Sequence, residues 1–262
     1  MKFLNASDDW KELRVSYANN KSDEFAFNRM PFTRVDAEKT NWKQIGGTNA
    51  SCAGVGYRYR QDNDPAVVPI YAENGIIVGL QTGYPESQMK SEKLIAWYKQ
   101  QPMFEVEHPE YDPSETLYTL RVYFSNPDYI CDKDFKYVHN FYYINGTKKV
   151  SVPHEASKLD KIWVKARCNP GKGWHYYDQM PKDLNCDYFQ PFFPMYHNET
   201  LVAFAFVSFG KFDSKRYGKN EYHPNTQYKG LIDVVPDCLY TVGYNLTTLH
   251  GYMIEKPWEI KC

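Results

Sequence analysis

Two glutamates in one short alternating segment are the clearest candidates for acid–base chemistry. Glu105 and Glu107 stand at alternate positions in the sequence Phe104-Glu105-Val106-Glu107-His108. An extended chain places alternate side chains on one face, so both carboxylates would point the same way. Such a pair can bind a cation or hydrolyse a glycosidic bond. The same alternation is typical of a solvated strand that buries Phe104 and Val106, and we expect that plainer arrangement.

Other catalytic patterns are absent from the sequence. The histidines are scattered, with no His-x-His pair and no His-Glu-x-x-His motif. Neither a Gly-x-Ser-x-Gly nucleophile elbow nor a Gly-x-x-x-x-Gly-Lys-[Ser/Thr] phosphate loop occurs. Asp62-Asn63-Asp64 resembles part of a calcium loop but lacks the downstream glycine and glutamate. We therefore expect no enzymatic activity, no metal site and no cofactor other than a bound ligand.

Aromatic side chains are the stronger indication of a binding site. The chain has 23 Tyr, 15 Phe and 6 Trp, together 17% of its residues. Several gather between residues 168 and 200, in a stretch that we expect to be a loop. Exposing a large apolar side chain costs roughly 1.5–3 kcal/mol, so these rings must cover a core, contact a partner or wall a ligand. The residues that we expect to wall a ligand are Trp174, Tyr176, Tyr177, Phe192, Phe193, Tyr142 and Tyr143.

Glycosylation sequons indicate that the chain is secreted. Six N-x-[ST] sequons occur, whereas chance predicts about one or two. Their first residues are Asn5, Asn20, Asn49, Asn145, Asn198 and Asn245. Met1-Lys2-Phe3-Leu4 is followed by polar residues rather than an apolar core, so we expect a signal peptide to have been removed.

The cysteines agree with an oxidising compartment. Their number is even, and no Cys-x-x-Cys pair occurs, which excludes a zinc ribbon or a thioredoxin-like motif. We expect all six to form disulfides. The simplest of the many possible connectivities is the sequential one, Cys52–Cys131, Cys168–Cys186 and Cys238–Cys262.

The charge balance limits the possible partners. With 31 basic and 32 acidic residues, the net charge is -1, so nucleic acid is not an expected partner. The longest apolar run, Leu201–Phe209, is too short to span a membrane as a helix. The low net charge permits a homo-oligomer, because it offers little self-repulsion.

Strand signals dominate the chain. Asn74-Gly75 and Asn145-Gly146 each separate two apolar runs, which predicts two β-hairpins. Ser91 can cap a helix that runs to Gln101. Short apolar runs predict further strands, among them Leu201–Phe209, Leu231–Val235 and Leu239–Tyr244.

The spacing of these segments predicts the fold class. The connections are too short for repeated βαβ crossovers, which favours antiparallel pairing. We therefore expect one domain, residues 1–262, that is mainly β and forms an antiparallel β-sandwich or barrel with one or two short helices.

Three stretches carry a resemblance to known proteins. They are Tyr118-Thr119-Leu120-Arg121-Val122-Tyr123-Phe124-Ser125-Asn126-Pro127-Asp128-Tyr129-Ile130-Cys131, the run from Trp174 through Cys186 to Tyr196, and Thr247-Thr248-Leu249-His250 with the closing Pro257-Trp258 and Cys262. Together they resemble a family of secreted invertebrate proteins without an established enzymatic activity. They are similar to the blue astaxanthin-binding carotenoproteins of floating hydrozoans. The resemblance implies a secreted, glycosylated β protein that holds a long conjugated ligand between aromatic and apolar walls, which can lie at a subunit interface.

Three functions follow as hypotheses. The first is a secreted, non-enzymatic binding protein for an elongated apolar molecule, a carotenoid such as astaxanthin or a lipid, with a pigment or carrier role. The second is an extracellular, lectin-like carbohydrate-binding protein, because aromatic faces stack on sugars. The third is a secreted glycoside hydrolase that uses Glu105 or Glu107.

Overall fold

A computed structural model of the chain describes residues 12–16, 26–47, 50–212, 214 and 222–262. Contacts within the chain divide it into two compact units. The first unit comprises Met1–Arg29, Ser91–Gln101 and Pro153–Cys262, and the second comprises Met30–Lys90 and Pro102–Val152. The single domain expected from the sequence stays a prediction.

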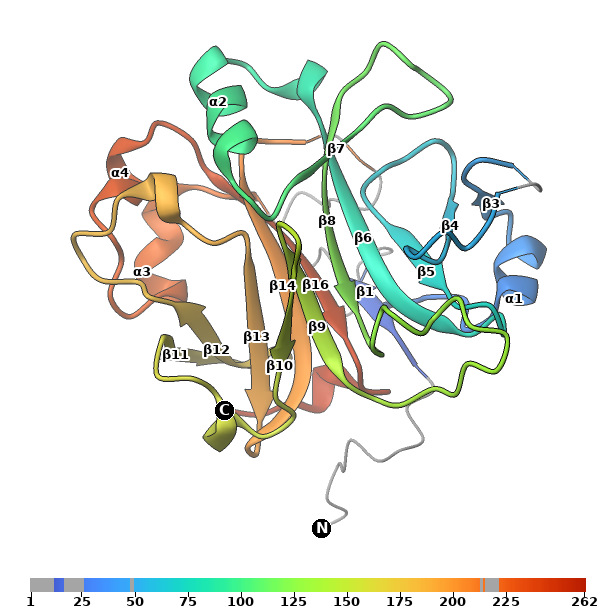
Figure 1. Cartoon of the computed structure of the whole chain (residues 1–262). Helices are drawn as coiled ribbons and strands as arrows, with labels where there is room; N and C mark the ends of the chain where they lie inside the picture. Colours follow the sequence, from blue (N-terminus) through green and yellow to red (C-terminus); the bar gives the residue numbers. More distant parts are fainter. Residues whose placement is uncertain (1–11, 17–25, 48–49, 213, 215–221) are drawn as a thin grey trace. The chain divides into compact units, whose positions relative to one another are not determined.

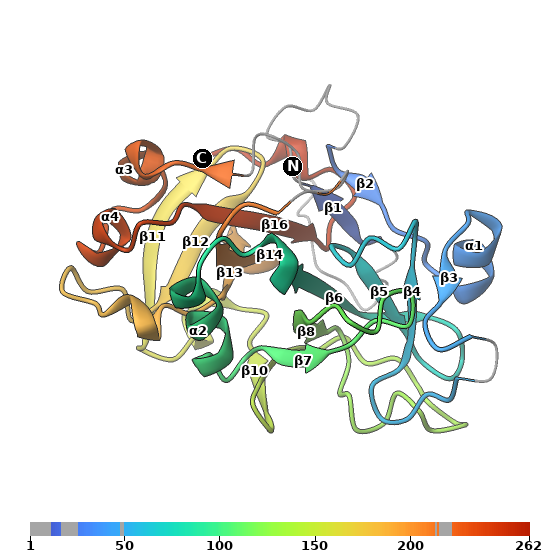
Figure 2. The ribbon, with the colours of Figure 1, turned by 90° about the horizontal axis from the view of Figure 1, so that it is seen from above.

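The first unit is built on an eight-stranded antiparallel sheet, which we call sheet 1. Its strands follow the order β11-β12-β13-β14-β16-β1-β2, with β15 beside β16. Figure 2 shows β12, β13, β14 and β16 running side by side. The strands are β1 (Arg14–Ser16), β2 (Asn28–Arg29), β11 (Trp163–Asn169), β12 (Gly173–Asp178), β13 (Phe192–His197), β14 (Thr200–Phe209), β15 (Tyr222–His223) and β16 (Leu246–Tyr252).

The central strands of sheet 1 are buried on both faces. Every residue of β16 is buried, as is every residue of β14 from Leu201 to Phe209. A strand in this position needs apolar side chains on both faces, which explains the continuous apolar run in β14. Gly251 of β16 is required by close packing, because a Cβ there would lie 2.3 Å from the ring of Phe204.

The second unit holds another eight-stranded antiparallel sheet, sheet 2. Its strand order is β10-β9-β8-β6-β5-β4-β3, with β7 beside β8. The strands are β3 (Lys43–Gln44), β4 (Tyr57–Arg60), β5 (Val68–Tyr71), β6 (Ile77–Pro85), β7 (Glu105–Glu107), β8 (Leu117–Tyr123), β9 (Phe141–Asn145) and β10 (Lys148–Val152). Both Asn-Gly hairpins are confirmed, β5–β6 and β9–β10. In the second hairpin Asn145 pairs with Lys148, so the turn itself is Gly146-Thr147.

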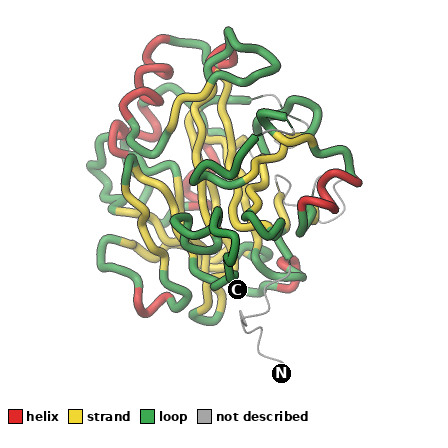
Figure 3. The backbone as a smooth tube through the Cα atoms, turned by 45° about the vertical axis from the view of Figure 1, so that its right-hand side comes forward, coloured by secondary structure: helices red, strands yellow, loops and turns green. Residues whose placement is uncertain are grey.

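Helices contribute little to the described residues, as Figure 3 shows by colour. The α-helices are α1 (Arg34–Lys39), α2 (Glu92–Gln100), α3 (Tyr228–Leu231) and α4 (Cys238–Thr241). Short 3-10 turns are η1 (Glu86–Gln88), η2 (Ala156–Lys158), η3 (Cys186–Tyr188), η5 (Asn225–Gln227) and η6 (Pro257–Glu259). As expected, Ser91 caps α2, and its side chain accepts a hydrogen bond from the backbone N of Leu94. No helix of the described segments is long and apolar enough to cross a membrane.

The mainly antiparallel β class is confirmed. Neither sheet closes on itself in the described part of the chain, which fits the open sheets of a sandwich and not a barrel. Three local predictions were wrong. Residues 169–200 contain β12 and β13, whereas Leu231–Val235 and Leu239–Tyr244 are not strands. Leu231 is the last residue of α3, and Leu239 lies in α4. Figure 1 shows these two helices beside each other, and the ring centroids of Tyr228 in α3 and Tyr240 in α4 lie 6.1 Å apart.

All six cysteines form disulfides, but two of the three expected pairs were wrong. Cys52–Cys131 is confirmed and lies in the second unit. The first unit contains Cys168–Cys262 and Cys186–Cys238. Cys168 pairs with Cys262 because the fold brings the C-terminal segment beside the turn that follows Cys168. In this contact the backbone N–H of Gly171 donates a hydrogen bond to the carbonyl oxygen of Ile260.

Candidate functional site

One face of sheet 1 carries a pocket, which we call the imidazole pocket after the two histidines in it. Its lining comes from five neighbouring strands, β11, β12, β13, β14 and β16, and from the segments that cover them. The lining residues are Asn169, Lys172, His175, Tyr177, Phe189, Phe193, Val207, Ile232, Leu246, Thr248 and His250. The pocket lies wholly within the first unit.

Strand β12 supplies two lining residues by alternation. His175 and Tyr177 point to the pocket face, so Trp174 and Tyr176 point to the opposite face. The rings of His175 and Tyr177 stack with their centroids 6.2 Å apart. Strand β13 adds Phe193, whose ring centroid lies 4.8 Å from that of Tyr177 and 5.3 Å from that of His175.

Strands β14 and β16 form the floor. Ala205 of β14 pairs with Phe193 on one side and with His250 on the other. Because the alanine side chain is a single methyl group, it leaves space between those two rings, whose centroids are 6.2 Å apart. Val207 and Thr248 form another cross-strand pair on the same face.

A disulfide fixes the apolar part of the cover. Phe189 directly follows η3, and Ile232 directly follows α3. Cys186 in η3 is bonded to Cys238 in α4, which ties the two covering segments to each other. The apolar rim is therefore held by a covalent link as well as by packing.

The turn between β11 and β12 provides the polar end. Asn169 ends β11, and Lys172 stands just before β12 and donates a backbone hydrogen bond of 2.9 Å to the Asn169 carbonyl. Cys168, which precedes Asn169, is bonded to Cys262. The second disulfide of this unit thus lies next to the polar end.

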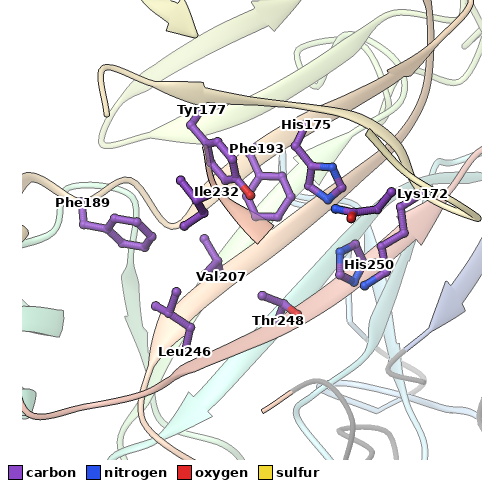
Figure 4. A pocket seen from close by; sticks show the side chains of 11 residues that line it. Lys172, His175, Tyr177, Phe189, Phe193, Val207, Ile232, Leu246, Thr248 and His250 are labelled. Atoms are coloured by element: carbon purple, nitrogen blue, oxygen red, sulfur yellow. The ribbon is translucent and has the colours of Figure 1, made fainter. Parts of the chain in front are cut away.

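The pocket is chemically two-sided. Figure 4 shows Phe189, Ile232 and Leu246 toward one end and Lys172 and His250 toward the other. The polar end offers an ammonium group, two imidazoles, an amide and the Thr248 hydroxyl. None of the eleven lining residues is an Asp or a Glu. Any charge that the pocket itself contributes is therefore positive.

His175 is neutral near neutral pH. Its Nδ1 atom lies 3.1 Å from the carbonyl oxygen of Gly173 and 3.2 Å from that of Arg167. Carbonyl oxygens only accept, so Nδ1 carries a proton and Nε2 of the neutral ring holds a lone pair. Burial, and then the neighbouring His250 and Lys172, lower the pKa of His175 to about 3.

Two other groups at the polar end are costly to bury. Lys172 is only 8% exposed, although an ammonium group loses strong hydration when it leaves water. The Nδ2 atom of Asn169 is buried and has no hydrogen-bond partner among the described residues. Buried donors in native proteins are nearly always satisfied, so an unused amide in a pocket is a notable feature.

The cavity is small. Its volume is about 30 Å³, which is enough for roughly two or three water molecules. The enclosed space therefore takes only two or three water-sized groups, and the rest of any larger ligand lies outside it. A long conjugated chain does not fit at full length in the pocket as it stands.

The structure does not bring the seven predicted ligand residues together. Tyr177 and Phe193 line the imidazole pocket. Trp174, Tyr176 and Phe192 lie on the opposite face of sheet 1, where Trp174 is 39% exposed. Their partners there are the ammonium of Lys165 over Trp174, the ring of Tyr196 against Tyr176, and the ring of Trp163 against Phe192.

The remaining two predicted residues, Tyr142 and Tyr143, belong to β9 in the second unit. The polar residues of the pocket were missed, above all Lys172, His175 and His250. One signal was available, because His175 and Tyr177 stand two residues apart and would share a face of any strand. The prediction of a loop for residues 169–200 does not use this signal.

The paired glutamates lie on sheet 2 and are each tied to an arginine. Glu107 lies 2.5 Å from Nη1 of Arg58, and Glu105 forms an ion pair with Arg121. Phe104 is buried as expected, but the expected burial of Val106 was wrong, because Val106 is 56% exposed while both glutamates are half-buried. These pairings give both carboxylates a structural role. Among the described residues, no group of three or more His, Cys, Asp or Glu side chains could hold a metal ion.

The sequons fall in different settings. Asn198 is exposed in the turn between β13 and β14 and has a φ of 49°. Asn145 and Asn245 are half-buried. Asn5, Asn20 and Asn49 lie outside the described residues. Of the described sequons, Asn198 is the best placed to carry a glycan.

Comparison with known proteins identifies no relative. No protein-family model matches the chain, and neither a curated protein nor a solved structure matches it. The site must therefore be interpreted from its own chemistry.

Proposed function

We propose that the chain is a secreted, non-enzymatic binding protein that carries a small apolar molecule in the imidazole pocket. The observation that carries the proposal is the two-sided lining of the pocket, with an apolar end and a few polar groups opposite. This is the usual composition of a small-molecule site, where apolar walls supply affinity and polar groups fix orientation. Two disulfides support the segments around the pocket, so the site is preorganised.

The size of the cavity favours a short lipid-like molecule over a long pigment. The elongated carotenoid stays a prediction, as does a homo-oligomer that would enclose one. A carotenoid would need more space than the cavity volume of about 30 Å³. An absorption spectrum of protein from its natural source tests this point, because a visible band would favour the pigment.

The site can be tested by filling the pocket with a larger side chain. Ile232 lines the pocket and is 4% exposed, whereas Val234, two residues further on, is 54% exposed and does not line it. We expect Ile232→Trp to weaken the binding of 1-hexanol by roughly tenfold or more, because the indole occupies the apolar end. Val234→Trp is the matched control and should bind hexanol like the parent. The measurement is an NMR chemical-shift titration.

If hexanol shifts no resonance of the pocket residues, or if both tryptophan variants bind it like the parent, the imidazole pocket is not the binding site. Circular dichroism and thermal unfolding of both variants would establish that they are folded.

Secretion and glycosylation are part of the same proposal. Three disulfides and the excess of sequons support an oxidising compartment. Expression through a eukaryotic secretory pathway should give glycoprotein whose mass falls on treatment with an N-glycosidase. The Asn198→Gln variant should lack one glycan, and an unchanged mass would contradict occupancy of that sequon.

A further inference from the structure

One buried nitrogen atom in the imidazole pocket has no hydrogen-bond partner among the described residues. It is Nε2 of His175, because both hydrogen bonds of this ring are made by Nδ1. His175 is only 4% exposed, and Figure 4 shows its ring at the same end of the pocket as Lys172 and His250. A buried polar atom without a partner is rare in a native protein, so this nitrogen indicates where a ligand binds.

The tautomer of His175 determines what its Nε2 atom can bind. The partners of Nδ1 are the carbonyl oxygens of Arg167 and Gly173, so Nδ1 carries the proton and Nε2 can only accept. Burial, and then the neighbouring His250 and Lys172, lower the pKa of the ring to about 3, so it stays neutral near neutral pH. The ligand must therefore present a hydrogen-bond donor to His175.

A second unpartnered atom in the lining is a donor. The Nδ2 atom of Asn169 is buried and has no hydrogen-bond partner among the described residues. Asn169 pairs with Gly173 across β11 and β12, and His175 stands two residues further along on the same face. Diagonal neighbours of this kind are roughly 7–8 Å apart at the backbone, and their side chains come closer. One ligand atom between them can therefore contact both the amide and the imidazole.

The other polar groups at this end of the pocket are already engaged. Lys172, Thr248 and His250 each make further interactions within the chain. An ammonium group that already has a partner gives no reason for the ligand to carry a negative charge. The head of the ligand is therefore determined by the two unpartnered atoms, one acceptor and one donor.

The size and the walls of the pocket limit the rest of the ligand. A volume of about 30 Å³ holds roughly two or three water-sized groups, such as a hydroxyl and the carbon atom that bears it. Phe189, Ile232 and Leu246 form the opposite end, so the carbon atoms that follow must be apolar. A hydroxyl donates and accepts through one atom, whereas an aliphatic amine is a charged donor near neutral pH.

Resting on the proposed function, we infer that the imidazole pocket binds the hydroxyl end of an uncharged alcohol, which donates to Nε2 of His175 and accepts from Nδ2 of Asn169. The ligand class is a primary alcohol with an apolar tail, whose hydroxyl and first carbon atom enter the enclosed space. A carboxylate has no proton to donate near neutral pH, and an ether has none at any pH. Both would leave Nε2 without a partner.

The test compares ligands that differ in the head group. We titrate 1-hexanol, its isomer methyl pentyl ether, and hexanoate into the protein at about pH 7, above the ordinary pKa of a carboxylic acid. Hexanol should bind roughly tenfold more tightly than either of the others, because a buried acceptor left without a donor is unfavourable by about that factor. The nitrogen NMR resonance of His175 Nε2 should shift with hexanol and not with the ether.

Three variants locate the effect. His175→Asn keeps a donor for the Gly173 and Arg167 carbonyls but has no acceptor at the position of Nε2, so hexanol and the ether should bind within about twofold of each other. Asn169→Ala removes the donor and should weaken hexanol binding several-fold. His197→Asn is the matched control, since His197 lies at the end of β13 outside the lining, and should keep the preference for hexanol. The three ligands and the Nε2 resonance of the unmodified protein answer the question even if His175→Asn does not fold.

The outcomes separate this inference from the proposed function. Equal affinity for hexanol and the ether in the unmodified protein would overturn the hydroxyl site and leave the apolar binding site standing. Tighter binding of hexanoate than of hexanol would show that the pocket selects a charged head, and would overturn the inference in the same way. A preference for hexanol that survives in His175→Asn would overturn the role of His175. If none of the three ligands binds, the proposed function and this inference fail together.

Discussion

Acid should destabilise the protein, because the imidazole of His175 is buried in its neutral form. The unfolded chain takes up a proton on this residue near its ordinary pKa of 6.5, whereas burial beside His250 and Lys172 lowers the pKa in the folded protein to about 3. Between these values the unfolded state binds more protons than the folded state. The free energy of unfolding must therefore fall as the pH falls through this window, and the contribution is fully present above it.

The size of the effect follows from the two pKa values. Linkage gives a loss of roughly 2 kcal/mol between about pH 7.5 and about pH 5, with a ceiling of about 5 kcal/mol at still lower pH. Urea titrations at these two pH values would measure it. With a urea dependence of about 3 kcal/mol per molar, the midpoint should fall by roughly 0.7 M.

A variant isolates the residue. His175→Asn places an amide NH₂ near the position of Nδ1, so the hydrogen bonds to the Gly173 and Arg167 carbonyls can persist without a titrating ring. It should be less stable than the parent at all pH values but lose less stability on acidification. His197→Asn, at the end of β13, is the control and should keep the slope of the parent. A parent protein with no loss between the two pH values, or a His175→Asn variant with the full slope, would refute the reasoning.

Two further predictions concern packing and covalent structure. Gly251→Ala should lower the free energy of unfolding by roughly 1–3 kcal/mol in urea titrations, because its methyl group meets the Phe204 ring at 2.3 Å. Gly230→Ala, in α3 and with no atom within 4 Å of the added Cβ, should leave it unchanged or raise it by up to about 1 kcal/mol, and an equal loss in both variants would contradict the packing argument. Peptide mapping without reduction should recover Cys186 linked to Cys238, and replacing both by Ser should cost about 4 kcal/mol, since the bond closes a loop with a sequence separation of 52.

Local signals in the sequence were sufficient for several elements. Ser91 predicted the start of α2, because a serine side chain can accept from the backbone N–H three residues on. Asn-Gly pairs predicted both hairpins, and the glycines Gly75 and Gly146 have the positive φ that such turns require. The long apolar run predicted β14, since few other elements tolerate nine consecutive buried residues of this kind.

The pocket could not be found in the same way. Strands β12 and β13 carry aromatic residues on both faces, so they lack the alternation of apolar and polar residues that marks a half-buried strand. Pro191 and Pro194 further favoured a loop there. His175 and His250 are far apart in the sequence, and only the strand order β12-β13-β14-β16 places them near each other. The apolar runs near α3 and α4 are too short to show either helical or strand periodicity, so the sequence does not distinguish a helix from a strand there.

The pairing of Cys168 with Cys262 has a consequence for biosynthesis. During translation Cys168 emerges long before Cys262, which lies 94 positions later, an interval of roughly 5–20 s at common elongation rates. Cys186 emerges within that interval, while its own partner Cys238 is still to come. Thiol oxidation on this timescale would join Cys168 to Cys186, so the final bonds require either delayed oxidation or exchange catalysed by an isomerase. The yield of active protein from a cell should therefore depend on its capacity for disulfide exchange.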